Sequence, residues 1–350
     1  MNRRKFYLTT AALTTTALLS LTACSGPAAE LAGDGAPPAD AAAENTSITV
    51  AMTNPSCILR FPAYVAVEQG FFAENGLDVE VRGLNGSSAV LQAMLANQAQ
   101  MGTPGTVPTL QAHIRGEDVV YVANTTPGGS FVLVSPQDKG FTDASDLDGK
   151  TIGVATADGG EVSFLKSIMT AAGLEDGAYE ILVVGEGGQA VAGFQRNDVD
   201  AYAASMDGMA TIEFAGIPLD DLTGTATKHL FGNGLAVSRS FMDANPEAVQ
   251  AFGKAYNQGM EYGLANFDKV VEACGKYQPQ EVEDPAYAEA LFKATVKSIT
   301  SPDGEVFGLF NPEYWDIAVQ DLVAAGEISE GDIDVTEVYT NEFVEGYGNP

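Results

Sequence analysis

The chain has 350 residues, of which 45% are hydrophobic and 18% charged, so it is apolar enough to bury a sizeable core and is not disordered throughout. Its 47 acidic residues outnumber 17 basic ones and give a formal charge of -30, a field that repels phosphate backbones and anionic lipid surfaces. We therefore expect no nucleic-acid partner. With 3 Cys and 2 His, the sequence also offers no disulfide scaffold and no metal-ligand cluster, and we expect neither metal nor cofactor.

Residues 1–24 predict an export signal, because a basic start at residues 3–5 precedes an apolar stretch over residues 6–21 that is short and rich in Thr. The ending Leu21-Thr22-Ala23-Cys24 resembles a bacterial lipobox. That resemblance implies cleavage before Cys24, lipidation of its thiol, and a chain held at the extracytoplasmic face of the cell membrane by its lipid anchor alone. A plain secretory peptide is the alternative, and the double arginine leaves twin-arginine export open.

Residues 25–47 contain one large apolar side chain, Leu31, and predict a flexible tether. From residue 48 onward, short β-rich runs alternate with helical segments, a pattern typical of α/β proteins with parallel sheets. We expect strands at 48–52, 77–84, 119–123, 130–135, 151–155, 179–184, 199–203 and 235–238. Long helices are predicted at 246–263 and 287–299.

Two sets of these units predict two lobes with a ligand cleft between them. Residues 48–138 and 229–350 are assigned to lobe 1, and residues 139–228 to lobe 2. The chain is expected to cross between the lobes near Gln137 and Lys228, and the tail to pack back on the first lobe. Open α/β sheets bind ligands at the carboxyl ends of their strands.

Three loops that follow strands and precede helices carry the candidate ligand contacts. Unpaired N–H groups at helix starts, with Ser, Thr or Gly beside them, favour an anionic or strongly polar ligand. The candidates are Asn54, Ser56, Thr103, Gly105 and Thr106 from the first lobe, and Gly160, Glu161 and Ser163 from the second. Ordinary helix capping by the same residues explains each loop equally well.

Charged residues on both lobes bear on the ligand class. Arg60 is suited to pairing with a sulfonate or carboxylate, unless it is a solvent-facing arginine at a helix start. Glu161 and Asp207 suit a ligand with amines or hydroxyls, or else serve as a helix-dipole partner and a turn residue. A zwitterion, or a ring with both donors and acceptors, satisfies all three.

The remaining polar and aromatic residues predict structural roles. Cys57 and Cys274 are expected to be unpaired, partly buried thiols, although an oxidising compartment permits a disulfide. His113 and His229 are isolated, which indicates surface or hydrogen-bonded residues. Trp315 is expected to anchor a tail helix in the core.

Several segments together resemble the nitrate, sulfonate, taurine and thiamine-pyrimidine binding proteins of ABC importers. The matching segments are 62–72, 76–81, 101–108, 146–154 and 197–201, in family order within residues 48–241. The resemblance implies a type II periplasmic-binding fold and capture of a small polar organic ligand by lobe closure, with no covalent step. It also implies delivery to a membrane permease and its ATPase, and we expect the protein to act as a monomer.

Two other classes of protein remain open. Gly185-Glu186-Gly187 begins a Gly-x-Gly-x-x-Ala spacing between a strand and a helix, an outline of the dinucleotide-binding turn of an NAD-dependent oxidoreductase, with Asp207 near the distance of a ribose-binding acid. Glu186 would face the pyrophosphate, however, and the chain carries an export signal. A surface lipoprotein without a transport role predicts no cleft and no small ligand.

Overall fold

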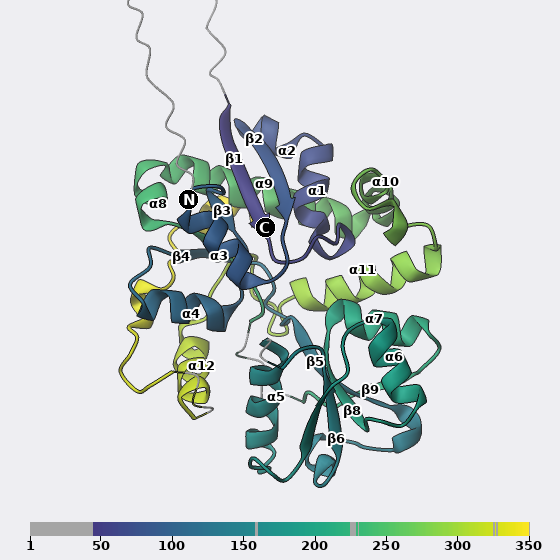
Figure 1. Cartoon of the computed structure of the whole chain (residues 1–350). Helices are drawn as coiled ribbons and strands as arrows, with labels where there is room; N and C mark the ends of the chain where they lie inside the picture. Colours follow the sequence, from purple (N-terminus) through teal and green to yellow (C-terminus); the bar gives the residue numbers. More distant parts are fainter. Residues whose placement is uncertain are drawn as a thin grey trace, which may run out of the picture. The chain divides into compact units, whose positions relative to one another are not determined.

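Two five-stranded sheets organise the part of the chain that the structure describes (Figure 1). The computed structural model describes residues 45–157, 160–224, 229, 231–324, 326 and 328–349, all within one unit that begins at Ala43. The export signal, Cys24, the tether up to residue 44 and Lys228 lie outside the described residues. Among the described helices, none has both the length and the apolar character to cross a membrane.

The first sheet has the strand order β2-β1-β3-β10-β4. β1 pairs in parallel with β2 and β3, and β10 runs antiparallel to both β3 and β4. These strands are β1 (Thr46–Met52), β2 (Leu77–Gly83), β3 (Met101–Gly102), β4 (Val120–Asn124) and β10 (Gly234–Val237). The helices that follow its strands are α1 (Phe61–Glu68), α2 (Phe71–Glu74), α3 (Ser87–Leu95) and α4 (Thr106–Ile114), with the 3-10 turn η1 (Ile58–Arg60) before α1.

The second sheet has the order β7-β6-β8-β5-β9, with β6 parallel to β7 and β8, and β5 antiparallel to β8 and β9. Its strands are β5 (Phe131–Pro136), β6 (Thr151–Val154), β7 (Glu180–Val183), β8 (Ala201–Ser205) and β9 (Leu219–Asp221). Its helices are α5 (Gly160–Ala171), α6 (Gly188–Gln195) and α7 (Met206–Phe214), and 3-10 turns lie at η2 (Gln137–Lys139) and η3 (Ala144–Leu147).

One strand lies in a different sheet from the one expected. The sequence placed residues 130–135 in the first lobe, but β5 pairs with β8 and β9 of the second sheet. The chain therefore leaves the first sheet after Asn124, and not near Gln137. The return lies between Asp221 and Gly234, which brackets the expected crossing near Lys228.

The tail contains α8 (Arg239–Ala244), α9 (Pro246–Ala265), α10 (Phe267–Tyr277), α11 (Pro285–Ile299) and α12 (Pro312–Ala324), with 3-10 turns η4 (Pro279–Glu281), η5 (Val335–Glu337) and η6 (Val344–Tyr347). As expected, α9 packs on the first part of the chain, so closely to α1 that a Cβ at Gly259 would lie 2.1 Å from the carbonyl oxygen of Pro62. Trp315 is a core anchor, 2% exposed.

Helix α11 packs on both parts of the chain, which the sequence did not predict. It contacts η1 beside the first sheet and, more extensively, α7 beside the second (Figure 1). The rings of Phe214 in α7 and Tyr287 in α11 have centroids 5.3 Å apart, and Lys297 pairs with Asp221 of β9. The tail thus connects the two sheets in addition to packing on the first.

Cys57 and Cys274 form a disulfide, with their Cα atoms 5.4 Å apart. The expectation of two free thiols is therefore wrong. The bond joins the loop after β1 to α10, and both residues are buried in a cluster that also contains Ile58, Phe61 and Val270. A covalent link thus holds the first predicted ligand loop against the tail.

Candidate functional site

The loop after β1 is shaped by its own polar side chains. Asn54 Oδ1 accepts the N–H of Ser56 at 2.7 Å, and Ser56 Oγ accepts the N–H of Leu59 at 3.2 Å. From the tail, Glu281 Oε2 accepts the N–H of Ile58 at 3.0 Å. The two predicted ligand residues of this loop therefore also fix the backbone that leads to Arg60.

Arg60 is half-buried, and its guanidinium interacts electrostatically with Tyr256, Asp207 and Tyr64. Its Nη2 donates to Thr53 Oγ1 at 2.9 Å, while its buried Nε has no hydrogen-bond partner among the described residues. Burial lowers the pKa of the guanidinium, and the charge of Asp207 acts in the opposite direction. A hydrogen-bond donor is thus available at the start of α1 for an acceptor on a ligand.

The second loop uses its polar groups mainly for structure. Thr103 is 1% exposed and its Oγ1 contacts Met52 Sδ at 3.4 Å. The N–H of Gly105 donates to Ser87 Oγ at 2.9 Å, and Thr106 Oγ1 donates to the carbonyl of Phe231 at 3.0 Å. These contacts favour the structural explanation for this loop, although Gly105 itself is half-buried.

Asn233 connects the loops with the two crossings, and sequence reasoning missed it. Its Nδ2 donates to the carbonyl of Thr103 at 2.8 Å and approaches Thr53 Oγ1 at 3.4 Å. Its Oδ1 accepts from Ser130 Oγ at 2.9 Å. Asn233 is 6% exposed. Its buried hydrogen bonds therefore fix the backbone of the loop after β3 relative to both crossings. The one signal in the sequence is its place just before a returning strand.

From the second sheet, Glu161 is 6% exposed at the start of α5, and its Oε1 accepts both the N–H and the Oγ1–H of Thr156, at 2.9 and 2.8 Å. Gly160 lies so close to Phe131 that a Cβ would meet the ring at 3.1 Å. The carbonyl of Ser163 accepts from Ser167 Oγ at 3.1 Å. Glu161 therefore stabilises its own loop with one oxygen of its carboxylate.

Glu161, Glu186 and Asp207 form what we term the acidic cluster. Burial raises the pKa of the Glu186 carboxyl, and the charges of Asp207 and Glu161 raise it further. Burial also raises the pKa of Glu281, against the hydrogen bonds it accepts, and Asp207 adds to the rise. Asp207 also acts on Arg60, so one member of the acidic cluster is electrostatically coupled to the arginine at the start of α1.

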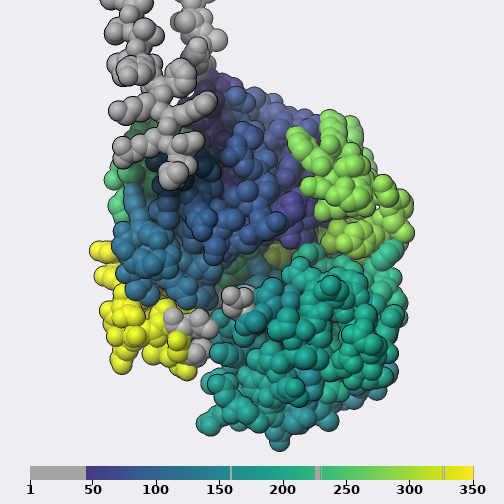
Figure 2. All heavy atoms as spheres, viewed as in Figure 1, coloured from purple at the N-terminus to yellow at the C-terminus, as the bar shows by residue number. Residues whose placement is uncertain are grey.

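This arrangement offers hydrogen-bond acceptors on one side and a guanidinium donor on the other. On the visible face, Figure 2 shows a furrow between the blue residues of the first sheet region and the teal residues of the second. The described residues contain no group of three or more His, Cys, Asp or Glu placed to hold a metal ion. The arrangement can therefore hydrogen-bond a polar molecule from two sides.

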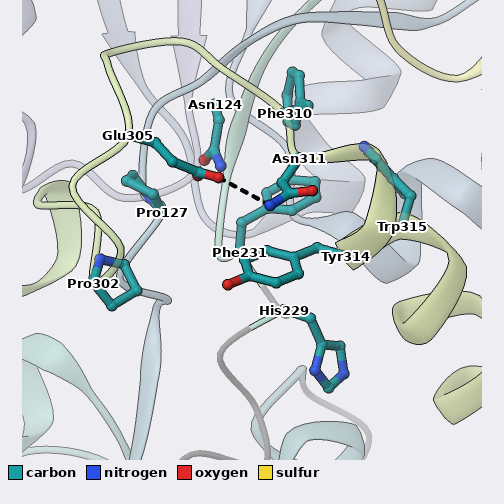
Figure 3. Close-up of a pocket in the computed structure, with 10 residues that line it drawn as sticks. All are labelled: Asn124, Pro127, His229, Phe231, Pro302, Glu305, Phe310, Asn311, Tyr314 and Trp315. Carbon is teal, nitrogen blue, oxygen red and sulfur yellow. Dashed lines mark hydrogen bonds between the residues drawn. The ribbon is translucent and has the colours of Figure 1, made fainter.

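The other polar candidates have ordinary partners. His229 Nε2 lies 2.7 Å from Asp321 Oδ2, and His113 Nε2 lies 3.7 Å from Glu337, in agreement with the prediction of hydrogen-bonded or surface residues. The carbonyl of Gly185 accepts from the hydroxyl of Tyr202 at 2.9 Å. The pocket drawn in Figure 3 contains none of the predicted site residues.

Comparisons with known proteins give the family and the fold. A family model described as NMT1/THI5 like matches residues 60–269, more than half of the chain. The riboflavin-binding protein RibY of Chloroflexus aurantiacus is 25% identical over 340 residues, 94% of this chain and 95% of that protein. The 4-amino-5-hydroxymethyl-2-methylpyrimidine phosphate synthase of Aspergillus parasiticus is 26% identical over 219 residues, covering 58% of this chain and 63% of that enzyme.

Among solved structures, the periplasmic aliphatic sulphonate binding protein SsuA from Escherichia coli matches with a TM-score of 0.69 and 14% identity, over 84% of this chain and 92% of that one. At this identity the likeness concerns the fold alone. It confirms the two-lobe periplasmic-binding fold that the sequence predicted.

Proposed function

Because the chain belongs to the NMT1/THI5-like family, we propose that it is the solute-binding component of an ABC-type import system. The fold agrees with such a role, and RibY, a relative matched over nearly its whole length, is named a binding protein. We propose further that the bound molecule passes unaltered to a permease and its ATPase. Lipidation at Cys24, a monomeric chain and an extracytoplasmic location belong to the same proposal. So does closure of the lobe built on the second sheet over the lobe built on the first.

The ligand we propose is an uncharged heteroaromatic ring whose edge carries both acceptors and donors. The observation that carries this proposal is that Arg60, whose buried Nε has no partner among the described residues, feels the charge of Asp207, which belongs to the acidic cluster. The arginine supplies a donor, and carboxylates accept from ring N–H or hydroxyl groups. An anionic ligand such as a sulfonate would have to approach Glu186 and Asp207, and the repulsion between like charges disfavours it. Riboflavin and an aminopyrimidine both meet the requirement.

The test is a calorimetric titration of the protein with riboflavin, 4-amino-5-hydroxymethyl-2-methylpyrimidine and an alkanesulfonate. We expect one of the two ring compounds to bind and the alkanesulfonate not to bind. Arg60→Met should weaken the binding by at least about tenfold, because a charge-assisted hydrogen bond is lost. Arg82→Met is the matched control, since Arg82 is an exposed arginine that pairs with Glu80.

Three results would contradict the proposal. If only the alkanesulfonate bound tightly, the acidic cluster would not exclude anions, and its carboxylates would not select a ring compound. Recovery of a chemically altered ring compound, measured by mass spectrometry after incubation, would instead favour a synthase, the activity named for the Aspergillus parasiticus relative. Binding of NAD with no ring compound bound would favour the oxidoreductase alternative at Gly185-Glu186-Gly187.

A further inference from the structure

A second cavity lies at the crossing that leaves the first sheet, apart from the candidate site. Two neighbouring hollows share Asn124, the last residue of β4, with Pro127 and Glu305. The wider hollow encloses about 510 Å³, open solvent included. Its wall is mainly apolar, formed by Met260, Leu264, Ile299, Val306 and Phe307. None of the proposed ligand residues lines it.

Asn124 and Glu305, on the wall that the two hollows share, present hydrogen-bond acceptors, while the indole Nε1 of Trp315 in the narrower hollow is a buried donor without a partner among the described residues. Asn124 is 6% exposed, and its buried Oδ1 has no hydrogen-bond partner among the described residues. The carboxylate of Glu305 accepts from Asn311 Nδ2 at 3.0 Å. Figure 3 shows the amide of Asn124 and the carboxylate of Glu305 on the same side of the narrower hollow. A buried acceptor without a donor is unfavourable, so Asn124 Oδ1 favours an occupant that donates a hydrogen bond to it.

Positive charge is scarce around these acceptors. The described residues lining the two hollows include no Lys or Arg, and His229 already pairs with Asp321. The formal charge of the whole chain is -30, which raises the local concentration of cations. A cation is therefore favoured over a neutral donor such as an alcohol.

We propose that this cavity is a second ligand site, which binds a small organic ammonium ion with an apolar chain. The ammonium group donates to Asn124 Oδ1 and to the Glu305 carboxylate, and the chain lies along Met260, Leu264 and Val306. Leu264 and Val306 are 40% and 42% exposed, so covering them with an alkyl chain removes apolar surface from water. The site does not depend on what the cleft binds.

The test uses butylammonium and its uncharged counterpart butanol with the full chain, at matched ionic strength. Ligand-observed NMR gives the dissociation constant, which we expect at or below roughly 10 mM for butylammonium, with weaker binding of butanol. Trp315 lines the adjoining hollow and is the single tryptophan of the sequence, so its indole N–H resonance should shift with the same midpoint.

Glu305→Gln should weaken butylammonium binding about tenfold, because the charge-assisted bond becomes neutral. Glu330→Gln, a change of the same formal charge at an exposed residue, should leave it unchanged. Equal binding of butanol, an unaffected Glu305→Gln variant, or no saturable response would each overturn the proposal. No saturable response is expected if the side-chain amide of Asn124 is flipped, so that its Nδ2 donates to the Glu305 carboxylate and no acceptor is left unpaired. Ring-compound binding in the cleft is measured separately, so either proposal can fail alone.

Discussion

The side-chain amide of Asn233 donates to the carbonyl oxygen of Thr103 at 2.8 Å, and so attaches the returning chain to the loop after β3. The same side chain accepts from Ser130, which begins the approach to β5. One buried carboxamide thus links both crossings to the loop after β3.

Asn233→Ala should destabilise the protein by about 3 kcal/mol, because several buried polar groups lose a partner at once. Urea unfolding measures the change. Asn266→Ala is the matched control: the Asn266 side chain donates to the carbonyl of Tyr262 in its own helical segment, and its loss should cost about 1 kcal/mol. Equal losses in the two variants would show that the Asn233 network contributes no more than a local hydrogen bond.

Removing the disulfide in a Cys57→Ser/Cys274→Ser variant should lower the free energy of unfolding by about 5 kcal/mol in the chain-entropy model, since the bond closes a loop with a sequence separation of 217. The loop that carries Arg60 should loosen as well. Urea unfolding with and without a reductant measures the effect. The reductant should destabilise the parent protein and leave the variant unchanged; an equal response in both would contradict the prediction.

The acidic cluster predicts a pH-dependent stability. Burial first, then the charges of Asp207 and Glu161, raise the pKa of Glu186 above its ordinary 4.5, so the folded state holds this proton more tightly than the unfolded state does. The resulting stability is present below pH 4.5 and is lost as the pH rises through the raised pKa. Glu186→Gln should therefore gain melting temperature over the parent as the pH rises from about 4 to 7.

Glu175→Gln is the control for that series, because Glu175 is exposed and the variant changes the net charge by the same amount. The difference in melting temperature between Glu175→Gln and the parent protein should vary less with pH. If the difference in melting temperature between Glu186→Gln and the parent protein stays constant over the whole pH range, the predicted titration of Glu186 is excluded. Thermal unfolding at each pH supplies both series.

The hydrophobic pattern of the sequence predicted where strands and helices lie better than it predicted which other elements they contact. The alternation in residues 77–84 corresponds to β2, and the buried run 199–203 lies where β8 forms. The run at β5 is apolar whichever sheet receives it, so periodicity placed the strand correctly but could not assign its sheet. The same limit applies to α11, whose apolar pattern does not show that it meets both α7 and η1.

The candidate site was partly predictable for a similar reason. Arg60, Glu161 and Asp207 stand out in the sequence as charged residues beside predicted loops. In the structure the charge of Asp207 acts on Arg60, and the charges of Asp207 and Glu161 act on Glu186. Glu281 and Cys274 reach the first loop from more than 200 positions away, and such proximity has no signature in the sequence. In the sequence, Glu186 stands out only as a residue unfavourable to dinucleotide binding.

The position of β10 has a consequence for how the chain is assembled. All strands of the second sheet are contiguous in sequence from Phe131 to Asp221, whereas β4 joins the first sheet solely through β10 among the described strands. A nascent chain can thus complete the second sheet before Gly234–Val237, the strand that pairs with β4, has been synthesised. Until then, the backbone N–H and C=O groups of Val120–Asn124 have no strand partner in the first sheet. We therefore expect chaperones that act on the folding chain to bind this segment.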